Sequence, residues 1–344
     1  MKEAAHYTVL KGNEVVCAVC QRRCVIPEGE RGFCSTRLNH NGKLYSLSYD
    51  EVSSLAVAPI EKKPLFHFYP GSRWLSFGTL GCNFKCPGCQ NWDIAHAQPP
   101  ERKTENSISG TRYISPQEAV RIAKEEGCIG LSYTYNEPTV WFEYTLDCSK
   151  LAKENDLLTN YVTNGFITKN ALDEIGSCLD AFRVDIKGFS KKLYKDIAQI
   201  DDFRGILEVT KRAKYKWNMH VEIVTNIIPT FNDDENQLTE IAAWIRDELG
   251  HETPWHVTRF VPHLNLSHIS YTPVAVLEKA RKIGLDCGLS YVYIGNVPNH
   301  QAENTYCPRC RKLLIERNDF FIKQFNIVDG RCPGCKEPIP GRWK

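Results

Sequence analysis

Three cysteines in one short segment, Cys82, Cys86 and Cys89, have the spacing of metal ligands. Three thiolates reach three corners of a 4Fe-4S cubane and leave the fourth iron without a protein ligand, so that iron is open for chemistry. A structural zinc ion would need a fourth ligand, for which His96 is a candidate. The cysteines directly follow a β-type run that opens a series of strands and helices. This position favours a functional loop over a zinc knuckle.

Eight more cysteines form two sets of four. The C-terminal set consists of two Cys-Pro-x-Cys knuckles: Cys307, Cys310, Cys332 and Cys335. Each knuckle presents two thiolates in a tight turn, which predicts a zinc ribbon, with rubredoxin-like iron as the alternative. The N-terminal set is Cys17, Cys20, Cys24 and Cys34. Its four thiolates would saturate either zinc or an auxiliary iron–sulfur cluster, so we expect a closed site, with Arg22 and Arg23 offsetting thiolate charge.

Composition limits the class of protein. The chain has 344 residues, of which 42% are hydrophobic and 24% charged, as is usual for a globular protein. Its formal net charge of +2 provides no global field for nucleic acid or an anionic membrane. Neither a signal-peptide core nor a run of about 18 uncharged apolar residues is present, so we expect a cytoplasmic protein without a membrane segment. The cysteines therefore indicate metal sites and not disulfides.

The middle of the chain alternates β-type runs with helix-type segments, which is typical of βα units and a parallel sheet. We expect strands over 74–80, 130–135, 158–163, 182–186, 221–228 and 256–261, with a seventh run over 291–294. Helix signals include Ser115 as an N-cap and an apolar period over 233–250. Six units are fewer than a full barrel has. We therefore predict an α/β fold, a partial (β/α)6 TIM-like barrel with chemistry at the carboxyl ends of its strands.

Three domains are expected. Residues 1–70 would form an N-terminal four-cysteine module, residues 71–301 the partial barrel, and residues 302–344 a C-terminal zinc-ribbon or rubredoxin-like module. The last module would contain a hairpin of strands over 313–315 and 320–328. Both flanking modules need a metal to stabilise them because neither is long enough to bury much core.

The three-cysteine spacing on a partial barrel resembles the radical S-adenosylmethionine superfamily. The resemblance implies that the open iron binds the amino and carboxylate groups of S-adenosyl-L-methionine (SAM). It also implies that one electron from the reduced cluster cleaves SAM to methionine and a 5'-deoxyadenosyl radical, which abstracts hydrogen from a substrate.

Motifs at the second and third strand ends extend the resemblance, the second of them to glycyl-radical activating enzymes. Glu137 lies where radical SAM enzymes carry a Gly-Gly-Glu motif that contacts the methionine amino group, although Tyr135 and Asn136 replace the two glycines. The alternative is that Glu137 is an acid in the first turn of a helix. Asn164, in a Thr-Asn-Gly turn, corresponds to a position beside the ribose, and Asn-Gly is also a common turn.

Two further motifs match at later strand ends. Asp185 and Lys187 correspond to an Asp-x-Lys motif that touches the cofactor. Because side chains alternate along a strand, both point to one face. The two charges then either take part in chemistry in the barrel lumen or form a structural ion pair. His263, after Pro262, resembles a cofactor-binding histidine of the activating enzymes.

The whole chain, including segments 59–68, 81–84, 89–92, 254–260 and 293–297, resembles the AmmeMemoRadiSam radical enzymes of archaea and bacteria. This resemblance implies partner proteins of the AMMECR and Memo types, and a one-electron donor such as flavodoxin or ferredoxin. The target of the radical is left open among a protein glycine, a nucleic acid and a small molecule. A second hypothesis is a metal-stapled subunit that recruits partners. A third, a zinc-only nucleic-acid-binding protein, is disfavoured by the near-neutral charge.

Overall fold

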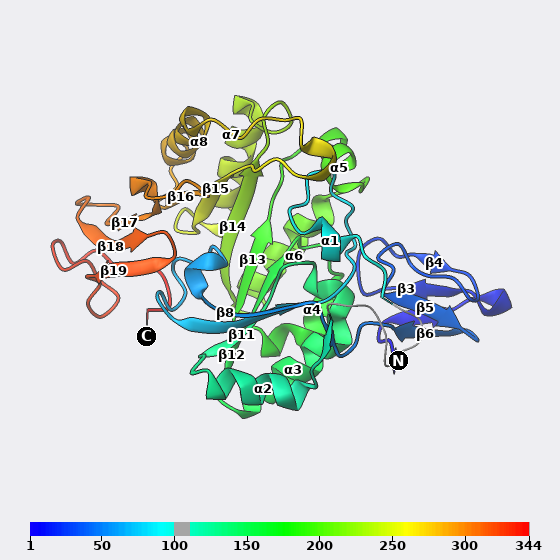
Figure 1. Cartoon of the computed structure of the whole chain (residues 1–344). Helices are drawn as coiled ribbons and strands as arrows, with labels where there is room; N and C mark the ends of the chain where they lie inside the picture. The colour runs from blue at the N-terminus through cyan, green and yellow to red at the C-terminus, as the bar shows by residue number, and fades with distance from the viewer. Residues whose placement is uncertain (100–110, 344) are drawn as a thin grey trace.

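The computed structural model describes residues 1–99 and 111–343. Its centre is an eight-stranded sheet in the order β16-β15-β14-β13-β12-β11-β9-β8 (Figure 1). Seven strands are parallel: β9 (Arg73–Gly78), β11 (Gly130–Tyr133), β12 (Leu158–Thr163), β13 (Ala181–Asp185), β14 (His220–Ile227), β15 (Trp255–Arg259) and β16 (Val292–Gly295). They confirm the predicted α/β class and the seven predicted runs. Strands β8 and β16 form the two edges, so the barrel is open.

One central strand was not predicted. Strand β8 (Ser54–Pro59) pairs antiparallel with β9 and adds an edge to the sheet. It falls within the range assigned to the N-terminal module, although its hydrogen bonds belong to the central sheet. The three domain boundaries remain predictions.

Helices cover one face of the sheet. They are α2 (Pro116–Glu125), α3 (Phe142–Glu154), α4 (Lys169–Ile175), α5 (Lys191–Ala198), α6 (Arg204–Tyr215), α7 (Glu235–Trp244) and α8 (Val274–Asp286). The short helix α1 (Trp92–Ala95) instead contacts the cysteine segment, where the carbonyl of Ile94 accepts from the amide of Gly81 at 2.9 Å. The hydroxyl of Ser115 accepts from the amide of Glu118 at 3.2 Å, which confirms the expected N-cap of α2. The helix predicted over 233–250 appears as α7 followed by the π-helical turn η5 (Ile245–Leu249). None of the described helices is long and apolar enough to cross a bilayer.

The two faces of the sheet differ in chemistry because side chains alternate along each strand. Toward the helices lie fully or almost fully buried apolar side chains such as Phe77, Tyr133, Tyr161, Phe182 and Trp255. The opposite face, which we call the inner face, is polar. Its register-matched residues include Ser76, Ser132, Asn160, Arg183, Glu222, His256 and Tyr293.

Short strands form the flanking regions. At the N-terminal side these are β1 (Lys2–Glu3), β2 (Tyr7–Val9), β3 (Val15–Cys17), β4 (Val25–Ile26), β5 (Arg37–His40), β6 (Lys43–Ser46), β7 (Glu51–Val52) and, paired with β7, β10 (Arg112–Tyr113). Turns of 3-10 type are η1 (Lys11–Asn13), η2 (Ile60–Lys62), η3 (Pro138–Trp141), η4 (Gly176–Cys178), η6 (Leu264–Leu266) and η7 (Gln301–Glu303). Figure 1 shows the N-terminal strands and the C-terminal strands on opposite sides of the central sheet.

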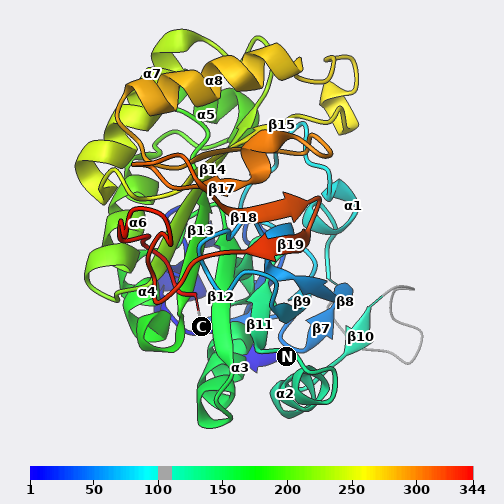
Figure 2. The ribbon, with the colours of Figure 1, turned by 90° about the vertical axis from the view of Figure 1, so that its left-hand side faces the viewer.

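The C-terminal sheet contains β17 (Thr305–Tyr306), β18 (Leu313–Asn318) and β19 (Phe321–Phe325), and in Figure 2 it lies in front of the central strands. The antiparallel pair β18 and β19 confirms the predicted hairpin. Arg317 of β18 is buried against the barrel, where it donates to the carbonyl of Phe66 at 2.9 Å and lies 3.9 Å from a carboxylate oxygen of Glu61. The backbone of Arg342 bonds to His67 and Tyr69. The last residues of the chain therefore hold segment 60–69 in place.

Candidate active site

The segment with Cys82, Cys86 and Cys89 leaves the carboxyl end of β9, as expected. The three thiols interact electrostatically, and burial raises the pKa of Cys89 to about 11. Across residues 1–99 and 111–343, these thiols and His96 do not form a group with all ligand atoms within 4.8 Å. A cubane spreads its thiolates over separate irons, whereas zinc draws its ligands to one atom. Thiols that do not converge on one point are compatible with a multi-iron cluster.

The cysteine segment is anchored by amides from β11 and its following turn. The side-chain amide of Asn136 donates to the carbonyl of Gly81 at 2.7 Å, and its oxygen accepts from the amide of Thr79 at 3.1 Å. Asn91 donates to the carbonyl of Tyr135 at 2.6 Å. Tyr135 and Asn136, which replace the glycines of the related motif, therefore tie β11 to the segment. The sequence comparison with that motif did not reveal this role.

Two glycines allow close packing around the cysteines. Gly81 has a φ of +82°, and a Cβ there would lie 2.5 Å from the carbonyl oxygen of Cys34. A Cβ on Gly88 would lie 2.9 Å from the side chain of Leu266. The second contact comes from η6, the turn that follows β15. Side chains at either position would therefore displace the cysteine segment from its neighbours.

His263 is the N-cap residue of η6 and is half-buried. Two residues later, the amide of Asn265 donates to the carbonyl of Pro87 at 2.9 Å. The structure thus brings the turn that carries His263 against the cysteine segment. The cofactor contact of its imidazole stays a prediction.

Glu137 is buried and holds four protein donors. One carboxylate oxygen accepts from the amide and hydroxyl of Thr139 at 3.0 and 2.5 Å and from the hydroxyl of Thr163 at 2.7 Å; the other accepts from the amide of Asn164 at 2.7 Å. Burial raises the pKa of Glu137, although these hydrogen bonds act in the opposite direction. Glu137 is also the N-cap residue of η3. This position immediately precedes the first helical turn, in which the alternative interpretation places the acid. A contact with the methionine amino group stays a prediction.

Asn164 connects Glu137 to the cysteine segment. Its side-chain amide donates to the side-chain oxygen of Asn83 at 2.8 Å, and its own oxygen accepts from the amide of Phe166 at 3.0 Å. Asn83 is fully buried next to Cys82, and its side-chain nitrogen has no hydrogen-bond partner in the described part of the chain. A buried donor without an acceptor is rare in folded proteins. It is therefore a position where a bound group would supply an acceptor.

Asp185 and Lys187 both lie near the cysteine segment, but the predicted pair is not formed as an ion pair. Arg183 donates to a carboxylate oxygen of Asp185 at 2.9 Å, and Arg183 is a residue that the motif search missed. Although burial opposes the charged form of Lys187, the charges of Asp185 and Cys86 raise its pKa. Alternation along β13 was enough to find Arg183, since it precedes Asp185 by one strand repeat.

Comparison with known proteins identifies the family. Residues 77–242 match the model of the Radical SAM superfamily. The uncharacterized protein MJ0808 of Methanocaldococcus jannaschii is 45% identical over 341 residues, which are 98% of this chain and 99% of that protein. This chain belongs to the radical SAM superfamily.

More distant proteins are similar over parts of the chain. MJ1632 of the same organism, named as a candidate glycyl-radical enzyme activating enzyme, is 23% identical over 221 residues, or 64% of this chain and 77% of that protein. The crystal structure of a radical SAM methyltransferase from Sphaerobacter thermophilus superposes with a TM-score of 0.50 at 14% identity, covering 72% of this chain and 71% of that one. The latter likeness concerns the fold alone.

The radical SAM family implies a 4Fe-4S cluster and SAM, and the residues present fit both. Cys82, Cys86 and Cys89 give three thiolates to a cluster that needs a fourth, open iron. The unpartnered side-chain nitrogen of Asn83 offers a hydrogen bond to a cluster sulfide or to SAM. Hydrogen bonds to the sulfurs are one way in which proteins set the potential of such clusters.

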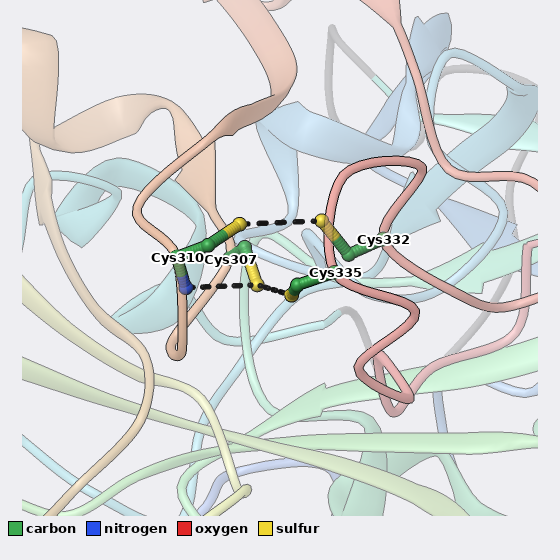
Figure 3. Close-up of side chains that lie close together, drawn as sticks. All are labelled: Cys307, Cys310, Cys332 and Cys335. Carbon is green, nitrogen blue, oxygen red and sulfur yellow. Dashed lines mark hydrogen bonds between the residues drawn. The ribbon is translucent and has the colours of Figure 1, made fainter.

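The C-terminal cysteines of this radical SAM protein form a compact group. Their four sulfur atoms lie within 4.8 Å of one another, and Figure 3 shows them converging from two turns. The sulfurs of Cys307 and Cys335 are 3.5 Å apart, and those of Cys310 and Cys332 are 3.6 Å apart. Burial opposes ionisation of Cys332, but the backbone amides of Cys335 and Gly334 lower its pKa to about 6. The arrangement suits one tetrahedral metal ion.

The N-terminal cysteines lie close enough to interact but are less compact. The charges of Cys17, Cys24 and Cys34 act on Cys20, and no three of the four have their sulfurs within 4.8 Å in the ranges that the structure covers. Burial raises the pKa of Cys24, and the charge of Arg22 acts in the opposite direction, as its expected role requires. Arg22 also donates to the carbonyl of Asn83 at 3.1 Å. The buried Arg37, missed from the sequence, adds positive charge beside Cys17 and Cys34. Zinc and an auxiliary cluster both remain predictions for this set.

Proposed function

We propose that this protein cleaves SAM reductively and uses the resulting radical to take a hydrogen atom from a substrate at the inner face of the barrel. When bound, the 4Fe-4S cluster supplies the electron for cleavage. The observation that carries the proposal is the placement of Cys82, Cys86 and Cys89 at the carboxyl end of β9, beside the unpartnered donor of Asn83. Membership in the radical SAM superfamily supports it.

The chain's own residues would position the reactants. Asn83 and Asn164 hold the cysteine segment against β12, and Asn136 holds it against β11. Asp185 and Lys187 place opposite charges near Cys86, where they would orient the amino acid end of SAM. These groups come from the ends of four strands or from the turns that follow them, β9, β11, β12 and β13, so the parallel sheet is what brings them together.

Anaerobic turnover tests the proposal. The protein is reconstituted with iron and sulfide, reduced with dithionite and given SAM, and 5'-deoxyadenosine is measured together with the metal content. We expect product from the wild type and none from Cys86→Ala, because two thiolates no longer hold the cluster. Cys287→Ala, at the end of α8 and outside the three cysteine sets, is the matched control. Product from Cys86→Ala at the wild-type rate would overturn the proposal.

A second candidate function is the activation of a glycyl-radical enzyme, in which the hydrogen comes from a protein glycine. The similarity to MJ1632 favours it, at low identity. If this function is correct, a partner enzyme whose radical-bearing glycine is deuterated would transfer deuterium to 5'-deoxyadenosine. Absence of deuterium transfer with active protein would exclude that partner's glycine.

The finer metal and partner assignments are proposals as well. We propose zinc for the C-terminal set, since four converging thiolates give zinc its preferred tetrahedron. We further propose a flavodoxin or ferredoxin as electron donor, and AMMECR-type and Memo-type proteins as partners. Metal analysis after reconstitution tests the first. Replacement of dithionite by each reduced donor tests the second, and purification of complexes with AMMECR-type and Memo-type proteins tests the third.

A further inference from the structure

Segment 60–69 closes the inner face at the amino-terminal ends of the strands. Its side chains Ile60, Leu65 and Phe68 are fully buried and pack against Trp74 and Ala181, which start β9 and β13. This apolar floor lies at the end of the sheet opposite the cysteine segment. Polar side chains of the inner face, such as Arg183, therefore lie between the floor and the cluster loop along the strands.

Lys63 extends from this segment toward the interior. Only 3% of its surface is exposed, and its ammonium lies 5.6 Å from the ring centre of Tyr135, in the turn after β11. No hydrogen bond or ion pair joins this ammonium to any residue in the described ranges, and its nitrogen is not among the fully buried atoms, so it keeps some accessible surface. A largely buried ammonium without a counter-charge is unfavourable, and a bound anion would relieve that cost.

Arg183 brings a second positive charge to the same region. One of its terminal nitrogens bonds to Asp185, but its Nε is buried without a partner in the described part of the chain. Strand register places Glu222 opposite Arg183. The carboxylate of Glu222 does not pair with Arg183; instead it binds two histidine rings and a backbone amide, those of His220, His256 and His67 respectively.

We propose that Lys63 and Arg183 bind an oxyanion, a carboxylate or phosphate group, of the substrate. The two cations have donors that no protein group uses, and an oxyanion between them would satisfy both. The Tyr135 ring near Lys63 tolerates a cation and gives it no counter-charge. The inference rests on the proposed function, because it assigns the anionic end of the substrate to the floor of the barrel and the reacting end to the cluster side.

A purely structural role for Lys63 makes a different prediction. If Lys63 only filled space above the floor, methionine would replace it without effect on anion binding, because its unbranched chain has a similar length. Burial and the charges of Lys62 and Arg183 lower the pKa of Lys63 to about 7, which agrees with an ammonium that lacks a counter-ion. An oxyanion would supply that counter-ion.

Anion titration decides between the two roles. Inorganic phosphate and malonate are titrated calorimetrically into reconstituted wild type, Lys63→Met and Lys62→Met, without SAM or reductant. Lys62 is the matched control because it is the exposed neighbour of Lys63. We expect saturable binding to the wild type and to Lys62→Met, and at least a roughly tenfold loss of affinity in Lys63→Met. Binding of phosphate alone identifies a phosphate group, and binding of malonate alone identifies a carboxylate.

Equal binding by Lys63→Met, or no binding of either anion to the wild type, would overturn the inference. A melting temperature for Lys63→Met at or above that of the wild type shows that the variant folds, and we expect this because removal of an unpaired buried charge is stabilising. The proposed function has its own readout, formation of 5'-deoxyadenosine by the wild type. Failure of that reaction with intact anion binding would reject the radical chemistry and leave the oxyanion site.

Discussion

The side-chain amide of Asn164 donates a 2.8 Å hydrogen bond to the side-chain oxygen of Asn83. This bond joins the turn after β12 to the residue that follows the first cysteine of the cluster segment. It makes the position of Cys82 dependent on a strand two places away in the sheet.

Asn164→Ala should therefore loosen the cluster. One buried hydrogen bond contributes about 1 kcal/mol, and the oxygen of Asn83 would lose this donor. We expect faster loss of iron to a chelator, followed by absorbance, and less 5'-deoxyadenosine. Asn170→Ala, exposed on α4, serves as the control. Equal iron-loss rates in both variants would show that the bond does not hold the segment.

Glu137→Gln should destabilise the protein before any ligand is added. Four donors point at the carboxylate, and an amide nitrogen in place of either oxygen would face at least one of them. Leaving buried donors unsatisfied costs about 1–3 kcal/mol. Thermal unfolding of the anaerobic protein measures the effect. If Glu137→Gln melts with the wild type but fails to bind SAM, the carboxylate acts mainly on the cofactor.

The stability of Lys63→Met relative to the wild type should depend on pH. The pKa of Lys63 is lowered from 10.5 to about 7 in the folded chain. Between these values the unfolded chain holds a proton that the folded chain releases, so the stability of the wild type rises with pH across this window. The advantage of the methionine variant should be largest below about pH 7 and shrink toward pH 10.5. The nearby Tyr135 adds no charge at the lower end of this window, because burial raises its pKa.

Calorimetric melting of both proteins across that range measures the difference. If the difference in stability between the two proteins does not change with pH, Lys63 does not have the lowered pKa. Phosphate or malonate, where they bind, should reduce the pH dependence because they favour the charged form of Lys63.

Removal of Arg317 should destabilise the barrel and not only the C-terminal sheet. Its side chain is fully buried between the carbonyl of Phe66, Thr305 and Glu61. Breaking such a buried arrangement costs about 3–5 kcal/mol, mainly because Glu61 is left without its counter-charge. Arg317→Ala should expose segment 60–69 to hydrogen exchange, whereas Arg309→Ala should not, since its side chain is 69% exposed. Protection of segment 60–69 in both variants would show that the floor is independent of the C-terminal sheet.

The parallel strands of the barrel could be predicted from the sequence because buried parallel strands consist of contiguous β-type residues. Leu158–Thr163 was predicted with the bounds that the structure has. Strand β8 escaped because it is half-buried along most of its length and lies in a segment assigned to the N-terminal module. The register and the open edges of the sheet follow from tertiary pairing, which no local pattern encodes.

The residues of the site also fall into those that a local sequence pattern reveals and those that only the tertiary structure brings together. Cysteine spacing is local, so the C-terminal group was found before the structure. Asn83 and Asn164 are 81 residues apart in sequence, and Lys63 lies 120 residues before Arg183. No spacing rule connects such pairs. Their relation is visible only when strand order brings the turns together, or when a charge proves to have no partner.

The grip of the C-terminal residues on segment 60–69 has a consequence for biosynthesis. A ribosome releases residues 60–69 long before Arg317 and Arg342 are made, so the floor cannot take its final form until those residues have emerged. If the four C-terminal thiolates bind zinc as proposed, the C-terminal sheet becomes stable only once the metal is bound. The supply of zinc would then act as a checkpoint on the docking of segment 60–69 at the amino-terminal ends of the strands.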